Sequence, residues 1–310
     1  MNADVNDQGF EQRSVNMNAD NVVRFDESKV NDQGFVKIYK TLKFTDSDLV
    51  PLSEYNLKNK APRDVFCFEI EDKLIGIPLY ELAYHHLAQG KVDTKNFLLT
   101  FCPVCNSGML LDPIVDGKTL NFRVGGVYKG AMIMADNETN SFWDPVTGEC
   151  LGGKLKGQQL EILSSHQILT IDEARKEKKD MYLPKVTLSL WQRLVRRFQN
   201  GHTWRALPEG KFYPGFKESF ILNDDRREEK EMGIGIWDGR KAKFYPLDSI
   251  ISKETIEDED FFDSKIIVNN NSVTKIPEVV FSNGKDTGYF VFTRWYSFAQ
   301  TFPGCDIFKD

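Results

Sequence analysis

The chain has 310 residues, of which 40 are basic and 46 acidic, and its formal net charge at pH 7 is −6. A chain of this length can bury a core without disulfides or metals to hold it together. The acidic balance argues against a general nucleic-acid binder, because such a protein needs a clustered basic surface. No apolar run approaches the ~18 residues that span a bilayer, so we expect no membrane partner.

The five cysteines are an odd number in a large chain, which does not match the disulfide framework of a small secreted protein. The N-terminus is polar and acidic, without the basic and apolar regions of a signal peptide. We therefore expect a reducing, cytoplasmic location. The cysteines are Cys67, Cys102, Cys105, Cys150 and Cys305.

Residues 1–62 are expected to form an N-terminal arm that is largely disordered to about residue 40. MNAD at Met1 recurs at Met17, and VNDQGF at Val5 recurs at Val30. The segment is rich in Asn, Asp and Gln and poor in apolar residues, so it cannot bury a core of its own.

From residue 63 the sequence predicts short strands and helices. Residues 64–77 show apolar alternation on both sides of a polar turn, which predicts two strands. Pro78 then opens a helix, PLYELAYHHLAQ, with Gly90 just beyond its end. NFLLTF is a buried strand that leads to Cys102. Further strands are expected in residues 108–112, 118–126, 131–136 and 158–163, and a helix in residues 171–178.

An internal repeat divides the rest of the chain. Residues 64–82 resemble residues 231–250, each with a strand, a polar turn, a strand and Pro-Leu at a helix start. Residues 171–184 and 294–308 resemble each other as a short helix followed by an extended exit. We therefore predict an α+β, β-rich fold of two related antiparallel modules with short helices. Their boundaries are 63–185 and 217–310, joined by residues 186–216, which include a basic amphipathic helix around Arg193, Arg196 and Arg197.

The segment FCPVCNSG places Cys102 and Cys105 on a tight turn. A thioredoxin-like redox site needs a helix directly after the motif, whereas Met109–Leu111 reads as a strand. A metal knuckle needs a residue tolerant of positive φ after the second cysteine, and Asn106 suits that position. Three readings stay open: a metal site, a thiol redox site, and a turn whose buried cysteines act as small hydrophobes.

Two adjacent histidines are the nearest partners for these thiols. Helical periodicity points His86 at the core and places His85 at the edge of the same face. A histidine in such a position is more often a structural residue than a metal ligand.

Several blocks of the chain appear in the order and spacing of a known family. The blocks are IPLYELAYHH, LLTFCPVCNSG, LLDPIVDGKTLNFRVGG, NSFWDPVTGECLGGKLKGQQLEIL, DDRREEKEMGIGIWDGRKAKFYPL and WYSFAQTFPGCDIF. From about Cys67 to the C-terminus, the chain resembles the bacterial and archaeal domain-of-unknown-function family 3179 (DUF3179). Many members are exported or lipid-anchored, and no activity follows from the resemblance.

The resemblance also implies which residues form the site. Family members usually carry Trp-His-Glu where this chain has Tyr84-His85-His86, so the resemblance selects His85. The family's Cys-Pro-Leu-Cys block matches Cys102–Cys105. This chain departs from the family at Lys129-Gly130-Ala131, where relatives often have Asn-Ser-Asp. Possible additional site residues are His86, Ser141, Trp143 and Thr147.

Three functions follow as hypotheses. In the first, Cys102, Cys105 and His85 bind zinc or copper and leave a coordination position open. In the second, the two cysteines are the exchanging pair of a thiol–disulfide oxidoreductase. In the third, the protein is a non-enzymatic scaffold. We expect an unidentified small molecule or protein as partner, and no nucleotide cofactor.

Overall fold

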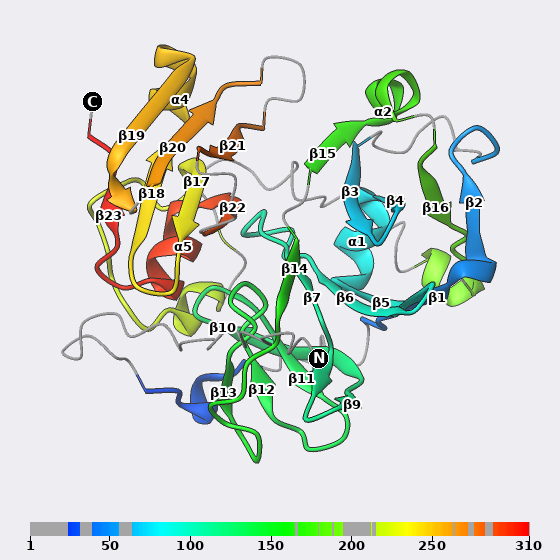
Figure 1. Ribbon diagram of the computed structural model, residues 1–310. Helices are drawn as coiled ribbons and strands as arrows, with labels where there is room; N and C mark the ends of the chain where they lie inside the picture. Colours follow the sequence, from blue (N-terminus) through cyan, green and yellow to red (C-terminus); the bar gives the residue numbers. More distant parts are fainter. Residues whose placement is uncertain are drawn as a thin grey trace, which may run out of the picture.

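The computed structural model describes residues 24–31, 39–55, 64–164, 167–178, 180–187, 189–194, 212, 215–262, 264–271, 276–282 and 288–309. Over these residues the chain is β-rich with few short helices, as predicted. Five β-sheets follow one another in a propeller-like ring (Figure 1). They do not evidently separate into the two predicted modules, because the largest core cluster contains side chains from both halves of the chain.

A five-stranded sheet, which we call the cysteine sheet, leads the chain into the Cys102–Cys105 turn. Its strands are, in order across the sheet, β1 (Leu42–Thr45), β5 (Leu87–Val92), β6 (Lys95–Thr100), β7 (Leu110–Leu111) and β14 (Ile162–Ser164). Along β6, Leu98 packs into one core cluster and Leu99 into another. The sheet is therefore covered on both faces, which explains the continuous apolar run NFLLTF.

A second sheet, the hairpin sheet, contains the predicted strand pair after residue 63. Its strands are, in order, β15 (Gln167–Thr170), β3 (Asp64–Ile70), β4 (Lys73–Pro78), β16 (Tyr182–Pro184) and β2 (Leu49–Pro51). Helix α1 (Leu79–His85) follows β4, and helix α2 (Ile171–Glu177) follows β15. The capping box of α2 consists of Thr170 and Glu173, each side chain accepting the other's backbone N–H.

The helix that begins after Pro78 is shorter than predicted. It ends at His85, and His86 adopts a φ of 64°. The carbonyl of His86 accepts a hydrogen bond of 2.7 Å from the Phe101 N–H, so the following residues run beside β6 and form β5. Gly90 therefore lies inside a strand, where an added Cβ would stand 1.8 Å from the Phe44 carbonyl oxygen of β1.

The C-terminal sheet repeats the strand order of the hairpin sheet. It consists of β22 (Tyr289–Arg294), β17 (Met232–Trp237), β18 (Ala242–Pro246) and β23 (Asp306–Ile307). In both sheets the first three of these strands are antiparallel and the fourth is parallel to the third. Helix α4 (Leu247–Lys253) follows β18, and helix α5 (Trp295–Thr301) follows β22.

The remaining strands form two larger sheets and one small one. The aspartate sheet, named after Asp136, contains β10 (Phe122–Tyr128), β11 (Ala131–Asp136), β12 (Phe142–Trp143) and β13 (Cys150–Gly152). A three-stranded meander contains β19 (Thr255–Phe262), β20 (Ser264–Asn269) and β21 (Glu278–Phe281), and β8 (Ile114–Val115) pairs with β9 (Lys118–Thr119). The described residues also include the 3₁₀ helices η2 (Glu27–Lys29), η4 (Asp46–Asp48) and η5 (Phe216–Ser219).

The structure describes parts of two predicted segments, the N-terminal arm (residues 1–62) and the connecting segment with the basic helix (residues 186–216). β1 and β2 lie within the predicted arm and pair with β5 and β16, so this part of the arm belongs to the fold. The repeated MNAD segments and most of both VNDQGF segments lie outside the described residues. In the predicted basic helix, Leu190, Trp191 and Leu194 are exposed. Arg196 and Arg197 of that helix lie outside the described residues.

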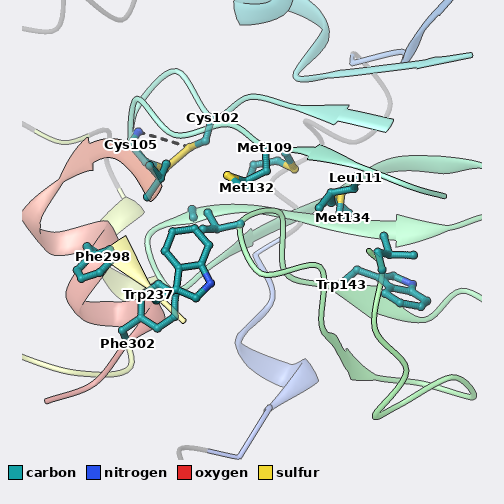
Figure 2. Close-up of a cluster of buried hydrophobic side chains, with 14 of the residues drawn as sticks. Cys102, Cys105, Met109, Leu111, Met132, Met134, Trp143, Trp237, Phe298 and Phe302 are labelled. Carbon is teal, nitrogen blue, oxygen red and sulfur yellow. Dashed lines mark hydrogen bonds between the residues drawn. A yellow bond between two sulfur atoms is a disulfide. The ribbon is translucent and has the colours of Figure 1, made fainter. Parts of the chain in front are cut away.

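The largest core cluster surrounds the cysteine turn. Figure 2 shows the two cysteines with Met109 and Met132 on one side and Trp237, Phe298 and Phe302 on the other. Cys102, Cys105 and Met109 lie between β6 and β7 of the cysteine sheet. The other side chains come from β11, β17 and α5 with its C-terminal cap. The turn is therefore a point at which several parts of the fold meet.

Candidate functional site: the Cys102–Cys105 turn

Cys102 and Cys105 are joined by a disulfide across the tight turn that follows β6. Their Cα atoms are 5.4 Å apart. The chain reverses here through paired backbone hydrogen bonds between Cys102 and Ser107, and Asn106 adopts a φ of 57°. The predictions of a positive φ at Asn106 and of a strand after the turn are both confirmed, because β7 follows at Leu110.

The two sulfur atoms have different surroundings. Cys102 Sγ accepts the backbone N–H of Cys105 at 3.4 Å. Cys105 Sγ instead lies 3.6 Å from the carbonyl oxygen of Gly130. Cys102 is 4% exposed and Cys105 is 0% exposed. One sulfur therefore faces a backbone hydrogen-bond donor and the other a backbone acceptor.

Gly130 reaches Cys105 because of a tight hairpin turn. Lys129 and Gly130 connect β10 to β11, and both have positive φ, at 54° and 68°. These angles are typical of the two-residue turns that match strand twist. A Cβ at position 130 would lie 2.6 Å from the Phe220 ring and 3.0 Å from the Tyr296 ring. The glycine that departs from the family pattern therefore has a steric reason.

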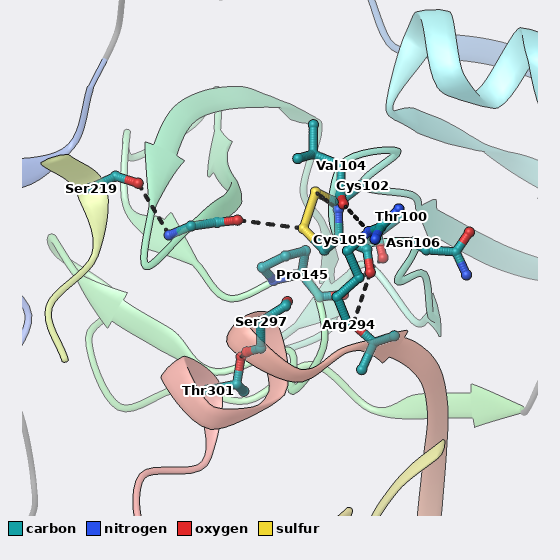
Figure 3. Close-up of a disulfide and its surroundings, with 12 residues drawn as sticks. Thr100, Cys102, Val104, Cys105, Asn106, Pro145, Ser219, Arg294, Ser297 and Thr301 are labelled. Atoms are coloured by element: carbon teal, nitrogen blue, oxygen red, sulfur yellow. Dashed lines mark hydrogen bonds between the residues drawn. A yellow bond between two sulfur atoms is a disulfide. The ribbon is translucent and has the colours of Figure 1, made fainter. Parts of the chain in front are cut away.

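The C-terminal sheet holds the turn from the opposite side. The backbone N–H of Arg294 and the hydroxyl of Thr293 both donate to the Cys105 carbonyl, at 3.1 and 3.0 Å. The Arg294 Nε donates to the Val104 carbonyl at 3.0 Å. The Asn106 side-chain amide donates back to the Phe292 carbonyl at 3.3 Å. Figure 3 shows Arg294 beside the turn and Ser297 of α5 directed toward the disulfide.

The histidines predicted as ligands have other contacts. His85 is 3% exposed, and its Nδ1 lies 2.5 Å from the Lys40 carbonyl oxygen. The His86 ring packs against Tyr39, with centroids 4.3 Å apart, and burial lowers the pKa of His86 to about 4. Within the described part of the chain, no three His, Cys, Asp or Glu residues are grouped as a metal would require.

Ser141 and Trp143 belong to a hydrogen-bond network centred on Asp136. Its carboxylate accepts the Trp143 indole N–H and the Ser141 backbone N–H, each at 3.0 Å, and both donors of Thr139. Burial raises the pKa of the Asp136 carboxyl, but these hydrogen bonds outweigh that effect and hold the pKa below its usual value. Asp136 was missed by the sequence analysis, although a charged residue ending the apolar strand AMIMAD was a possible signal.

Thr147 lies in the loop between β12 and β13. Its N–H donates to the Asp144 side chain at 2.9 Å, and its hydroxyl accepts the Glu149 N–H at 3.3 Å. These are local contacts that shape the loop. Two residues earlier in the same loop, the Pro145 carbonyl accepts the Thr100 hydroxyl at 2.8 Å, just before the cysteine turn.

The other cysteines are poor nucleophiles. All three are buried and free, and burial raises the pKa to about 12 for Cys67, about 11 for Cys150 and about 12 for Cys305. At neutral pH they stay protonated, and the thiolate is the reactive form. Thiol chemistry in the described chain therefore centres on Cys102 and Cys105.

The fold and the site define a β-rich protein with a buried CxxC disulfide at the junction of its sheets. The chain belongs to the family described as "Protein of unknown function (DUF3179)", whose model matches residues 45–302. This confirms the resemblance that the sequence blocks indicated. No curated protein and no solved structure matches the chain. None of the helices in the described residues has the length and apolar character needed to cross a membrane.

Proposed function

We propose that the protein is a thiol–disulfide redox protein in which Cys102 and Cys105 interconvert between disulfide and dithiol. The observation that carries this proposal is the single disulfide between them. It closes a ring of only four residues, so by chain entropy it stabilises the fold by only about 2 kcal/mol. A cross-link that adds so little stability is better suited to exchange than to holding the fold together.

The chemistry is a two-electron exchange with a dithiol reductant. A thiolate of the reductant attacks Cys102 Sγ, the more exposed sulfur, and the bond to Cys105 breaks. Cys105 leaves as a thiolate, takes up a proton, and donates its S–H to the Gly130 carbonyl. The second thiol of the reductant then attacks the mixed disulfide and releases Cys102. Overall the pair gains two electrons and two protons, and the reductant becomes a disulfide.

A redox titration tests this proposal. The protein is equilibrated with mixtures of reduced and oxidised glutathione and, to reach lower potentials, of reduced and oxidised dithiothreitol, and the free thiols are then alkylated and counted by mass spectrometry. We expect the pair to titrate with a potential between about −120 and −270 mV, the range of known exchanging dithiols. A potential below about −300 mV, typical of structural disulfides, would contradict it. Cys67→Ser, which lacks a different buried thiol, is the control and should titrate like the natural chain.

Metal binding by the reduced turn is the second candidate function. Support comes from the positive φ of Asn106 and the Cys105 N–H directed at Cys102 Sγ, both of which suit a metal knuckle. The predicted third ligand, His85, would have to bind in addition to its Lys40 contact. Reduced protein is titrated with zinc, and with copper(I), under anaerobic conditions. Less than about a tenth of an equivalent bound would count against a specific one-to-one site.

We also propose that the hairpin sheet and the C-terminal sheet arose by duplication of one module. Support comes from their shared strand order and from α1 and α4, which follow equivalent strands. Each of these helices is preceded by proline and followed by a residue with positive φ, His86 or Glu254. The second module has no CxxC, so we assign the redox chemistry to the first alone. If separate expression of residues 217–310 gave no folded unit, the modules would not be autonomous.

A further inference from the structure

The cysteine turn and the C-terminal segment Tyr289–Thr301 hold each other in place. The segment comprises β22 and α5, and it binds the turn through Thr293 and Arg294. The acceptors are the carbonyls of Val104 and Cys105. Val104 lies within the ring of residues that the disulfide closes, and Cys105 is one of the two cysteines that close it. The position of these two carbonyls is therefore fixed by the same four-residue ring that reduction opens.

The same segment also contributes side chains to the core that contains the disulfide. Trp295, Tyr296 and Phe298 of α5 are at most 3% exposed and belong to the core cluster that contains both cysteines. Ser297 is directed toward the disulfide (Figure 3). A reductant of protein size cannot reach Cys102, which is 4% exposed, unless part of the structure packed around the turn moves. Docking of the segment and access to the disulfide are thus linked.

We infer that the Cys102–Cys105 disulfide is a redox-controlled latch for the segment Tyr289–Thr301. With the disulfide closed, the two carbonyls are held where Thr293 and Arg294 can donate to them, and the segment is docked. When a dithiol reductant converts the pair to two thiols, the turn gains backbone freedom and the hydrogen bonds to the segment weaken. This inference rests on the proposed redox function, since it requires a pair that can be reduced in the folded protein.

Hydrogen–deuterium exchange with mass spectrometry tests the latch. Oxidised protein and protein reduced with dithiothreitol are compared for the peptide covering residues 289–301. The amides of Arg294, Trp295 and Tyr296 are hydrogen-bonded in the oxidised state, to Cys105, Glu231 and Glu229 respectively. We expect their exchange to become at least about tenfold faster on reduction and to return on reoxidation. The β19–β20 hairpin should not change.

Two variants separate the latch from the redox function. Cys102→Ser combined with Cys105→Ser removes the disulfide permanently and should give the fast exchange without any reductant. Thr293→Val removes the hydroxyl donor to the Cys105 carbonyl, keeps the disulfide and nearly keeps the side-chain volume, and should give a smaller rise confined to residues 289–301. Cys67→Ser, which lacks a distant buried thiol, should exchange like the natural protein.

The outcomes are distinguishable. Unchanged exchange at 289–301 in protein whose pair is shown by alkylation to be reduced overturns the latch and leaves the redox function standing. A pair that resists reduction in the folded protein overturns the redox function, and the double variant then decides the latch by itself. If the double variant loses protection everywhere, including in β19–β20, Thr293→Val decides: a local rise supports the latch, and no rise overturns it.

Discussion

At the scale of single residues, the two cysteines are chemically unequal although they share one disulfide. The Cys105 N–H is directed at Cys102 Sγ, and the Gly130 carbonyl oxygen lies beside Cys105 Sγ. We predict that, in reduced protein, iodoacetamide modifies Cys102 at least about ten times faster than Cys105, because the thiolate is the reacting form. Peptide mapping after brief alkylation measures the two rates. Equal rates would show that the turn does not distinguish the sulfurs.

Asp136 is a buried carboxylate at the end of β11 in the aspartate sheet. Its carboxylate accepts hydrogen bonds from Thr139, Ser141 and Trp143, and the residue is 0% exposed. In Asp136→Asn the new NH₂ group faces these donors, so we predict a loss of about 3 kcal/mol in the free energy of unfolding. Urea denaturation measures it. Thr139→Val, which removes one of the donors, should cost only about 1 kcal/mol.

The same carboxylate makes stability depend on pH. Because its pKa is lower in the folded chain than in the unfolded chain, its contribution is fully present above the ordinary Asp pKa of about 3.9. The contribution is lost as the pH falls through the lower, folded value. We predict that the stability difference between the natural chain and Asp136→Asn is constant near neutral pH and shrinks below about pH 4. If the difference in free energy of unfolding between the natural chain and Asp136→Asn grew as the pH fell, the pKa of Asp136 would not be lowered by folding.

At the scale of elements, the close approach of α5 to β17 depends on a glycine. A Cβ at Gly235 would lie 2.1 Å from the Phe298 ring, and that ring is itself buried. We predict that Gly235→Ala destabilises the protein by about 2 kcal/mol, because neither neighbour can move freely. Thermal unfolding measures the loss. Adding Phe298→Leu should recover part of it, whereas additive losses would show that the two positions are independent.

Local patterns predicted some elements better than others. The β3–β4 hairpin follows from apolar alternation around a polar turn, a pattern that acts within a few residues, and the helix predicted in residues 171–178 is α2. The end of α1 could not be predicted, because it depends on the hydrogen bond from Phe101 to His86, 15 positions earlier in the chain. The helical periodicity of PLYELAYHHLAQ predicted that the helix continues past His86, but these residues form strand β5 of the cysteine sheet instead.

At the scale of the whole molecule, reduction should weaken the fold only modestly. A four-residue ring contributes about 2 kcal/mol by chain entropy, less than the total stability of a typical domain. We predict that reduced protein stays folded, with a free energy of unfolding lower by about that amount. Urea denaturation with and without dithiothreitol measures it. Global unfolding on reduction would instead assign the disulfide a structural role.

The sequence predicted the place of the site but not its surroundings. The CxxC spacing, the tolerance of Asn106 for positive φ and the apolar strand that follows are local, and all appear in the structure. Thr293 and Arg294 could not be predicted as partners of the turn, because Thr293 lies 188 positions after Cys105 and its role arises only from folding. Ser141 and Trp143 were identified by family resemblance, yet the Ser141 N–H and the Trp143 indole N–H both donate to Asp136, and the Ser141 hydroxyl accepts the Leu155 N–H.

The separation of 188 positions between Cys105 and Thr293 also sets an order of events during synthesis. The ribosome releases residues 289–301 long after residues 102–105, and chains fold progressively from the N-terminal side. Until β22 and α5 emerge, the turn lacks its hydrogen bonds to Thr293 and Arg294, and the two thiols are open to oxidants and oxidases. The nascent chain therefore has a period in which the disulfide can form before the C-terminal segment closes over it.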